Sequence, residues 1–172
     1  MKKILILLTF AMLVVLASCK NKGTYRSPSI TFGNILLNHK EITDNVIHVG
    51  DTLEFYMLLN AYYSSLTNFN VVTDRSFLKD SVMSDAEFEK LCNVAASNRA
   101  TGMYTFKELG EGVSVGLSPL YIVAVKSPNS DDKTVTLSFQ LKNDSPLSGE
   151  YNPVTYPFKL KVLEKEVKND EE

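Results

Sequence analysis

The sequence predicts an all-β domain, an antiparallel β-sandwich with one short helix inserted between two strands. Apolar and polar residues alternate with a period of two in three segments, 53–60, 135–141 and 156–162. This period is typical of strands with one buried and one solvated face. Turn-forming residues separate such segments, as in Gly50-Asp51 and in the cluster 128–132, and strands joined in this way pack as two facing sheets.

The segment 135–141 has the clearest strand pattern, because its residues alternate strictly between apolar and polar side chains. The segment 156–162 repeats the pattern and places Lys159 and Lys161 on the water side. Weaker strand patterns cover 30–37, 66–73, 103–107 and 120–126. The chain is therefore expected to contain at least seven strands.

One segment follows a helical period instead. Its apolar residues fall at positions i, i+3, i+4 and i+7, namely Phe88, Leu91, Cys92 and Ala95. Ser84 and Glu87 predict a capping box at the start of the helix, and Met83 and Phe88 predict a hydrophobic staple. We expect a helix over about 85–97 that packs one face on a sheet.

The N-terminus has the pattern of a secretory signal peptide. Lys2 and Lys3 precede a mainly apolar run of 14 residues, 4–17, which then ends in small residues. As a helix this run would reach about 21 Å, against a hydrocarbon core of about 30 Å. The ending Leu16-Ala17-Ser18-Cys19 resembles the bacterial lipobox, which implies that Cys19 is lipidated and becomes the mature N-terminus. The alternative is an ordinary secreted protein with a cysteine near its cleavage site.

This interpretation divides the chain into a signal peptide over 1–18, a lipidated tether over 19–28, a domain over 29–163 and an acidic tail over 164–172. Several acyl chains would make the anchoring stable. In the lipoproteins that the lipobox resembles, Asp at position 20 signals inner-membrane retention, and Lys20 therefore implies the outer membrane. The sequence does not indicate whether the protein lies on the periplasmic or on the extracellular face of that membrane.

Removal of 18 of the 172 residues leaves a mature chain of 154, with 16 basic and 20 acidic side chains. The resulting net charge of about −4 argues against nucleic-acid binding, which requires a basic stripe. With Cys19 lipidated, Cys92 is the only remaining thiol, and no internal disulfide is expected. Cys92 is expected to be buried in the core.

One motif suggests catalysis but lacks the context for it. Residues 112–116 match G-x-S-x-G, the nucleophile elbow of α/β-hydrolases, with Ser114 as the nucleophile. That chemistry needs a helix after the serine and a histidine later in the chain, whereas His39 and His48 both precede Ser114. We therefore expect a glycine-flanked loop or edge strand here, no catalytic residues, and no enzymatic activity.

Metal and cofactor sites are not expected either. His39 and His48, even with Asp44 and Asp51 nearby, lack the ligand spacing of a zinc site. Asn129, Asp131 and Asp132 lack the alternating oxygen ligands of an EF-hand, and their turn chemistry explains them equally well.

Two loops are candidate binding sites. Tyr62-Tyr63 follows a long strand and could contact a glycan or a protein. Because the first two long strands run in opposite directions, we expect Tyr62-Tyr63 to lie near Ser29, on the side of the membrane anchor. His39, Lys40 and Glu41 should lie at the opposite end, which favours them for a large external partner.

The lipobox, the short tether and the segment Val49-Gly50-Asp51-Thr52-Leu53 together resemble the immunoglobulin-like lipoproteins of Gram-negative gut and oral bacteria, a family of unknown function. The segment 66–71 has the "Leu-x-x-hydrophobic" pattern that often follows in that family. The resemblance implies an immunoglobulin-like sandwich of about seven to eight strands and an outer-membrane location, and it carries over no functional residues.

Sandwiches without a catalytic constellation usually serve as scaffolds for loop contacts. We therefore expect a membrane-anchored, non-catalytic binding or accessory module whose partner is a glycan, an envelope protein or a host protein. The alternative is a structural component, such as a fimbria-related subunit, that joins its neighbours by strand addition.

Overall fold

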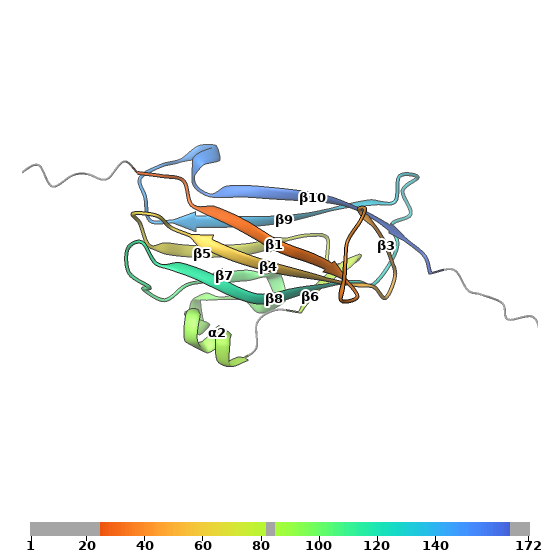
Figure 1. Cartoon of the computed structure of the whole chain (residues 1–172), viewed down its shortest axis with the longest axis horizontal. Helices are drawn as coiled ribbons and strands as arrows, with labels where there is room; N and C mark the ends of the chain where they lie inside the picture. The colour runs from red at the N-terminus through yellow and green to blue at the C-terminus, as the bar shows by residue number, and fades with distance from the viewer. Residues whose placement is uncertain (1–24, 82–84, 166–172) are drawn as a thin grey trace, which may run out of the picture.

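The computed structural model describes residues 25–81 and 85–165, which form two facing five-stranded sheets (Figure 1). Sheet A has the strand order β2-β1-β4-β8-β6, and sheet B has the order β3-β10-β9-β5-β7. The strands of sheet A are β1 (Ser29–Leu37), β2 (Lys40–Glu41), β4 (Thr52–Asn60), β6 (Leu78–Ser81) and β8 (Ser114–Ala124). Those of sheet B are β3 (Val46–His48), β5 (Leu66–Val72), β7 (Met103–Thr105), β9 (Thr134–Asn143) and β10 (Val154–Leu163).

The predicted immunoglobulin-like β-sandwich with one short helix is confirmed. Strands that follow one another in the chain repeatedly change sheet, and every pairing is antiparallel except the parallel pairing of β10 with β3. All seven predicted strands are present in the described residues. The additional strands β2, β3 and β6 are two to four residues long. Strands that short are too brief to show a period of two in the sequence.

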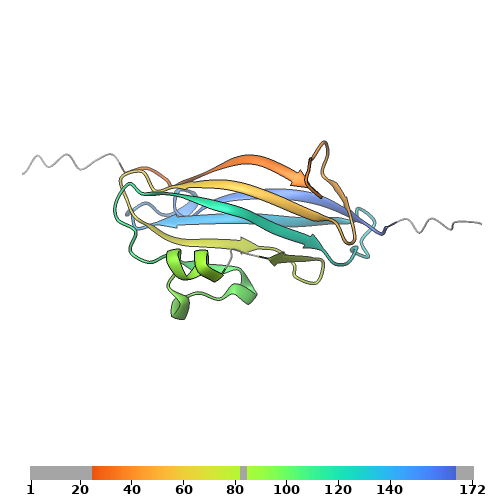
Figure 2. The ribbon, with the colours of Figure 1, turned by 60° about the horizontal axis from the view of Figure 1, so that its bottom comes forward.

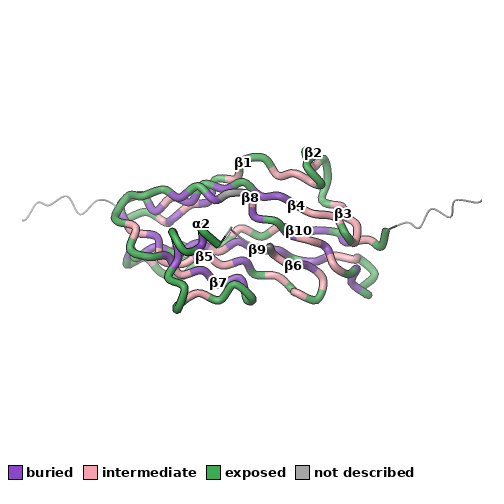
Figure 3. Tube along the Cα trace, turned by 90° about the horizontal axis from the view of Figure 1, so that it is seen from below, coloured by how far each residue is buried: buried purple, intermediate pink, exposed green. Residues whose placement is uncertain are grey.

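The core lies between the sheets and is built from the alternating apolar positions of the long strands (Figure 3). Its centre is a cluster of phenylalanines. Phe55 of sheet A and Phe139 of sheet B meet edge to face with ring centroids 4.9 Å apart, and Phe158 lies 5.7 Å from Phe139. Such aromatic contacts add to the stabilisation that burial of apolar area provides.

The helix is shorter than predicted. α2 (Asp85–Leu91) ends six residues before the expected position, and a 3-10 turn, η1 (Val94–Ala96), follows. Asn93 stops the helix because its side chain accepts a hydrogen bond from the Ala96 N–H, while its own N–H donates to the Thr105 carbonyl. Ala95, expected on the buried face, is exposed. The predicted cap residues Met83 and Ser84 lie outside the described residues.

The helix packs beside β7 at the lower edge of the sandwich (Figure 2). Phe88 of α2 meets Tyr104 of β7 edge to face at 6.1 Å, and Tyr104 is fully buried between Phe88 and Phe69. Cys92 is buried and unpaired, as predicted, and forms an isolated bridge with Phe106. The insertion therefore closes one side of the core.

The long strands run the length of the sandwich and separate its two ends (Figure 1). Ser29 pairs with Asn60 at the end where the described chain begins, and Leu37 pairs with Leu53 toward the other end. Near the first end, the Arg26 carbonyl accepts a hydrogen bond from the buried side chain of Asn143. Within the described parts of the chain, no helix has the length and apolar character needed to cross a bilayer.

Candidate functional site

The β1–β2 hairpin, one of the two predicted binding loops, is a rigid tip at the end of the sandwich distant from Ser29. Its two loop residues, Asn38 and His39, both have positive φ, at 49° and 68°, which is the requirement of a type I′ turn. The Asn38 side chain donates to Asp51 at 2.8 Å and accepts from the Thr52 N–H at 2.9 Å. These bonds attach the tip of the hairpin to the start of β4.

His39 is attached to a buried carboxylate on the outer face of sheet A. Both the N–H of His39 and its Nδ1 lie within hydrogen-bond distance of Glu54 Oε1, at 3.1 and 2.6 Å. Leu53 and Phe55, the neighbours of Glu54 on β4, point inward, so Glu54 points away from the core. Glu54 is nevertheless only 2% exposed. The hairpin tip therefore covers a charge that the sheet alone would leave in water.

Lys40 and Glu41 lie on the short strand β2, and both are exposed. Two hollows flank the chain where it leaves this strand. One, of about 350 Å³, is lined by residues of the stretch 37–44. The other, of about 310 Å³, lies against Gly33, Asn34 and Ile35 of β1. The predicted distal loop thus carries two shallow depressions with mixed charged and aliphatic walls.

The outer face of sheet A carries exposed aromatic side chains that the sequence reasoning did not single out. Tyr56 follows Glu54 on the same face of β4, and Tyr121 of β8 lies directly opposite Glu54 in the strand register. Partial loss of hydration, together with the nearby Glu54 and Tyr121, raises the pKa of Tyr56. The signal was available, because alternation along 53–60 places a large aromatic residue on the supposedly polar face.

Tyr62 and Tyr63, the other predicted loop, lie at the end where the described chain begins, as expected. The Tyr62 hydroxyl lies 3.0 Å from Ser29 Oγ, and the guanidinium of Arg26 stacks over the Tyr62 ring at 5.7 Å. Tyr62 therefore helps to attach the entering chain to the domain, whereas Tyr63 remains 61% exposed. The structure does not bring the two predicted loops together.

Ser114 of the G-x-S-x-G motif is the first residue of β8 and not part of a strand–turn–helix elbow. Its hydroxyl donates to Asn60 Oδ1 at 2.6 Å. The neighbouring strand β6 pairs only with residues 121–124 of β8, so this part of β8 has a partner on one side alone. The position agrees with the interpretation of the motif as a glycine-flanked edge strand.

The candidate metal ligands are occupied by local hydrogen bonds. His48 lies 3.7 Å from Asp51, while His39 contacts Glu54, so the two histidines face different carboxylates. Asp132 accepts a hydrogen bond from the Thr134 N–H, which is turn chemistry. Among the residues that the structure describes, no group of three or more potential ligands could hold a metal ion.

Comparisons with known proteins identify similar folds but no family. No family model matches the chain, and no curated protein matches it. Among solved structures, it is similar to a cohesin module from a Clostridium perfringens family 33 glycoside hydrolase, with 9% identity, coverage of 81% of this chain and 99% of that chain, and a TM-score of 0.45. A family 123 glycoside hydrolase from Clostridium perfringens matches over 81% of this chain but only 28% of its own, with 14% identity and a TM-score of 0.36. A PapD-like domain of human CEP192 matches with 10% identity, 87% and 94% coverage and a TM-score of 0.30. At this level of similarity, no residue role or partner is transferred to this chain.

Proposed function

We propose that this protein is a lipid-anchored, non-catalytic binding module of the bacterial cell envelope. The lipobox-like ending at residues 16–19 supports a lipid on Cys19, and Lys20 supports the outer membrane as its location. The β-sandwich supports a role as a scaffold that presents contact surfaces. Its partner would be a glycan, an envelope protein or a host protein.

One observation carries the proposal: the described chain begins at one end of the sandwich and the β1–β2 hairpin lies at the other (Figure 1). An anchor attached through residue 19 would hold the Tyr62 end close to the bilayer, because only a few residues separate Cys19 from the contacts of Arg26 and Ser29. The hairpin, with its two hollows, would then face away from the membrane. Contacts with a large partner would involve His39, Lys40 and Glu41.

Two experiments test the anchor and the contact surface separately. Cys19→Ala should abolish metabolic labelling with an alkyne fatty acid and leave unprocessed precursor, whereas normal labelling and anchoring would contradict lipidation. For the surface, the protein lacking its lipid is screened against immobilised glycans and envelope extracts. The triple variant with His39, Lys40 and Glu41 changed to Ala should lose binding and should keep a cooperative thermal transition. Unaltered binding, together with its loss on Tyr62→Ala, would assign the contact to the other end.

The alternative, a subunit joined to its neighbours by strand addition, needs an open sheet edge. The two outer strands of sheet B do not offer one. The N–H groups of Val46 and His48 on β3 donate to the carboxylates of Asp44 and Asp51. The backbone of β7 is bonded on its outer side by the segment 93–98, through contacts of Asn93 and Asn98.

The residues of β10 that do not pair with β3 are protected against strand addition in a different way. The Lys161 N–H donates toward β3, to the Asn45 carbonyl, so with a period of two the edge-facing N–H positions are 155, 157 and 159. Pro157 has no N–H to donate, and Lys159 places a charge on the edge. Proline and lysine are residues that natural edge strands use against pairing. These features protect sheet B against strand addition and favour the binding module, whereas in sheet A residues 114–117 of β8 pair with β4 alone.

A further inference from the structure

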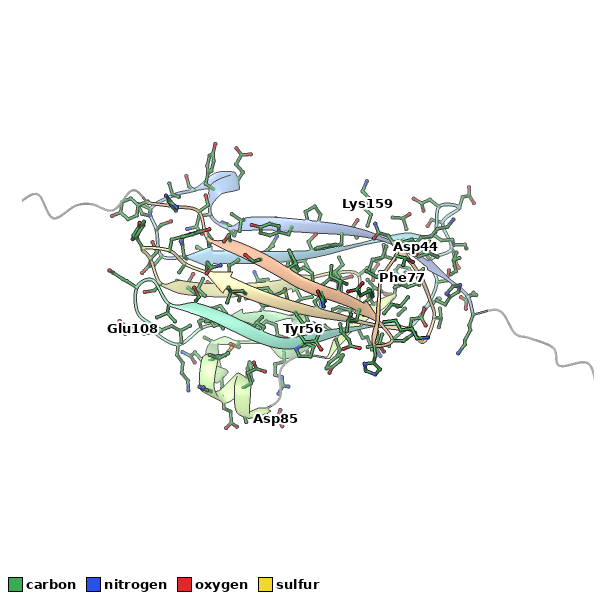
Figure 4. The ribbon with its side chains drawn as sticks, viewed as in Figure 1. Asp44, Tyr56, Phe77, Asp85, Glu108 and Lys159 are labelled. Carbon is green, nitrogen blue, oxygen red and sulfur yellow. The ribbon has the colours of Figure 1, made fainter. Side chains whose placement is uncertain are left out.

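The outer face of sheet A contains a strip of uncharged side chains that includes two exposed tyrosines. Along β4 the strip contains Tyr56 and Leu58, which are 38% and 43% exposed, and on β8 it contains Tyr121, which is 36% exposed. It continues to Asn60, which is hydrogen-bonded to Ser114. We call these five residues the tyrosine strip. Figure 4 shows Tyr56 near the middle of the sheet's length, with Asp44 and Glu108 toward opposite ends of the sandwich.

Glycines lie beside the large side chains of the tyrosine strip. Gly116 lies opposite Leu58 in the register of β4 and β8, and a Cβ added there would meet nothing within 4 Å. On the other side, Tyr56 lies next to Gly33 of β1, where an added Cβ would be 3.4 Å from the Tyr56 Cβ. The strip therefore has open space beside Leu58, and the backbone of β1 lies close to Tyr56.

The strip is also uncharged. The three central strands of this face, β1, β4 and β8, contain a single charged residue, Glu54. The flanking strand β6 adds the exposed Lys79, opposite Val123 of β8. The Glu54 carboxylate is buried and lies 2.6 Å from Nδ1 of His39. Its proximity contributes to the raised pKa of Tyr56. A ligand that needs ion pairs, such as a nucleic acid or an acidic polysaccharide, finds no partner charge on the three central strands.

Tyrosine rings beside amide and hydroxyl groups suit one class of ligand well. The apolar faces of sugar rings pack on aromatic faces, while the hydroxyls of the sugar exchange hydrogen bonds with Asn, Ser and Tyr. Tyr121 lies opposite Glu54, two residues before Tyr56 on the same face, so the two rings stand on adjacent strands and one chain of linked sugars could cover both. We propose that the tyrosine strip binds a neutral polysaccharide. The proposal deepens the proposed binding role by naming a ligand class, and it depends neither on lipidation of Cys19 nor on the hairpin.

The test uses the mature chain with Cys19 changed to Ala and measures binding to defined neutral polysaccharides. The probes are cellulose, chitin, xylan, mannan and starch, with polygalacturonate as an acidic control. Tyr56→Ala and Tyr121→Ala should each weaken binding to a neutral polysaccharide by about tenfold. Tyr151→Ala removes a tyrosine elsewhere on the surface that is more exposed, at 57%, and it should leave binding unchanged. Thermal melting confirms that each variant is folded.

Several outcomes would overturn the proposal. These are no binding to any neutral probe, preferential binding to polygalacturonate, or neutral-sugar binding that Tyr56→Ala and Tyr121→Ala leave unchanged. A photo-crosslinker placed at Tyr121 that captures an envelope protein in intact cells, with no sugar binding, would assign the strip to a protein partner instead. A double variant with Lys40 and Glu41 changed to Ala leaves the His39–Glu54 contact in place and tests the hairpin surface separately, so the two proposals can fail independently.

Discussion

Nδ1 of His39 lies 2.6 Å from Oε1 of Glu54, which joins a side chain that is 84% exposed to one that is 3% exposed. The contact connects the tip of the β1–β2 hairpin to the start of β4, the central strand of sheet A. Glu54 also lies two residues before Tyr56 on the same face of β4. One buried carboxylate thus connects the hairpin to the strand that carries Tyr56.

This relationship predicts that His39→Ala destabilises the protein although His39 is a surface residue. Removal of the imidazole leaves the buried Glu54 carboxylate with one fewer donor, and hydrogen bonds to charged groups contribute about 1.5–3 kcal/mol. We expect the free energy of unfolding, measured by chemical denaturation, to fall by about 1–2 kcal/mol.

Lys40→Ala is the matched control, because Lys40 is exposed and immediately follows His39; its effect should stay within about 0.5 kcal/mol. In a double-mutant cycle, His39→Ala and Glu54→Gln should couple. Strictly additive effects of the two substitutions would show that the contact contributes nothing to stability.

Asp51 predicts a pH dependence. Burial opposes ionisation of this carboxyl, but hydrogen bonds from the His48 N–H and the Asn38 side chain outweigh burial and hold its pKa below the usual 3.8. A depressed pKa in the folded state stabilises the protein above the unfolded-state pKa, and this contribution is lost as the pH falls through the folded-state value. The loss of stability on Asp51→Asn should therefore be largest near neutral pH and shrink below about pH 4. Urea unfolding of both proteins between pH 2.5 and 7 measures this difference in the free energy of unfolding. A difference that does not change with pH would contradict the prediction.

Gly102 predicts a strong backbone effect. Its φ is +67°, and a Cβ at this position would lie 2.6 Å from the Val71 carbonyl oxygen and would also clash with the Arg75 side chain. Gly102→Ala should lower the free energy of unfolding by about 2–4 kcal/mol, through strain and overpacking together. Gly116→Ala is the control, because it has open space and no positive φ. Equal effects of the two substitutions would contradict the described geometry.

Cys92 is expected to be chemically inert in the folded protein. Burial raises the pKa of its thiol to about 11, against the opposing influence of Lys107 and Arg99. Because the thiolate is the reactive form, a water-soluble disulfide reagent at pH 8 should label Cys92 only after denaturation. The variant Cys19→Ala provides a chain with this single thiol. Rapid labelling of the native protein would mean that α2 and the following turn do not cover Cys92.

The protected strands of sheet B predict that the unlipidated mature chain is a monomer. Analytical ultracentrifugation should show one species at concentrations up to about 100 μM, the range in which exposed edges lead to association. Pro157→Thr would restore an N–H donor on the open part of β10, and this variant is the one expected to associate. Polymerisation of the unmodified chain would favour the assembly subunit.

The long strands could be predicted because each has a repeated local pattern. In β9, alternation from Val135 to Leu141 places its apolar residues in the core, where Leu137, Phe139 and Leu141 are fully buried. The positions of the two loops also followed from strand direction alone, since β1 and β4 are antiparallel. The end of the helix could not be predicted from the sequence pattern, because Ala95 still fits the helical period. The helix stops because Asn93 is hydrogen-bonded to η1 and to β7.

The sequence by itself determined the sandwich class, the buried face of each long strand and the candidate export signal, because these depend on the spacing of neighbouring residues. Only the tertiary structure decided that Glu54 is covered by His39 and that Tyr121 lies beside Glu54 and Tyr56. Those contacts join residues that are 15 and 67 positions apart in the chain. The pairing register of β4 with β8 and the twist of the hairpin bring them together, and the local pattern of the sequence specifies neither.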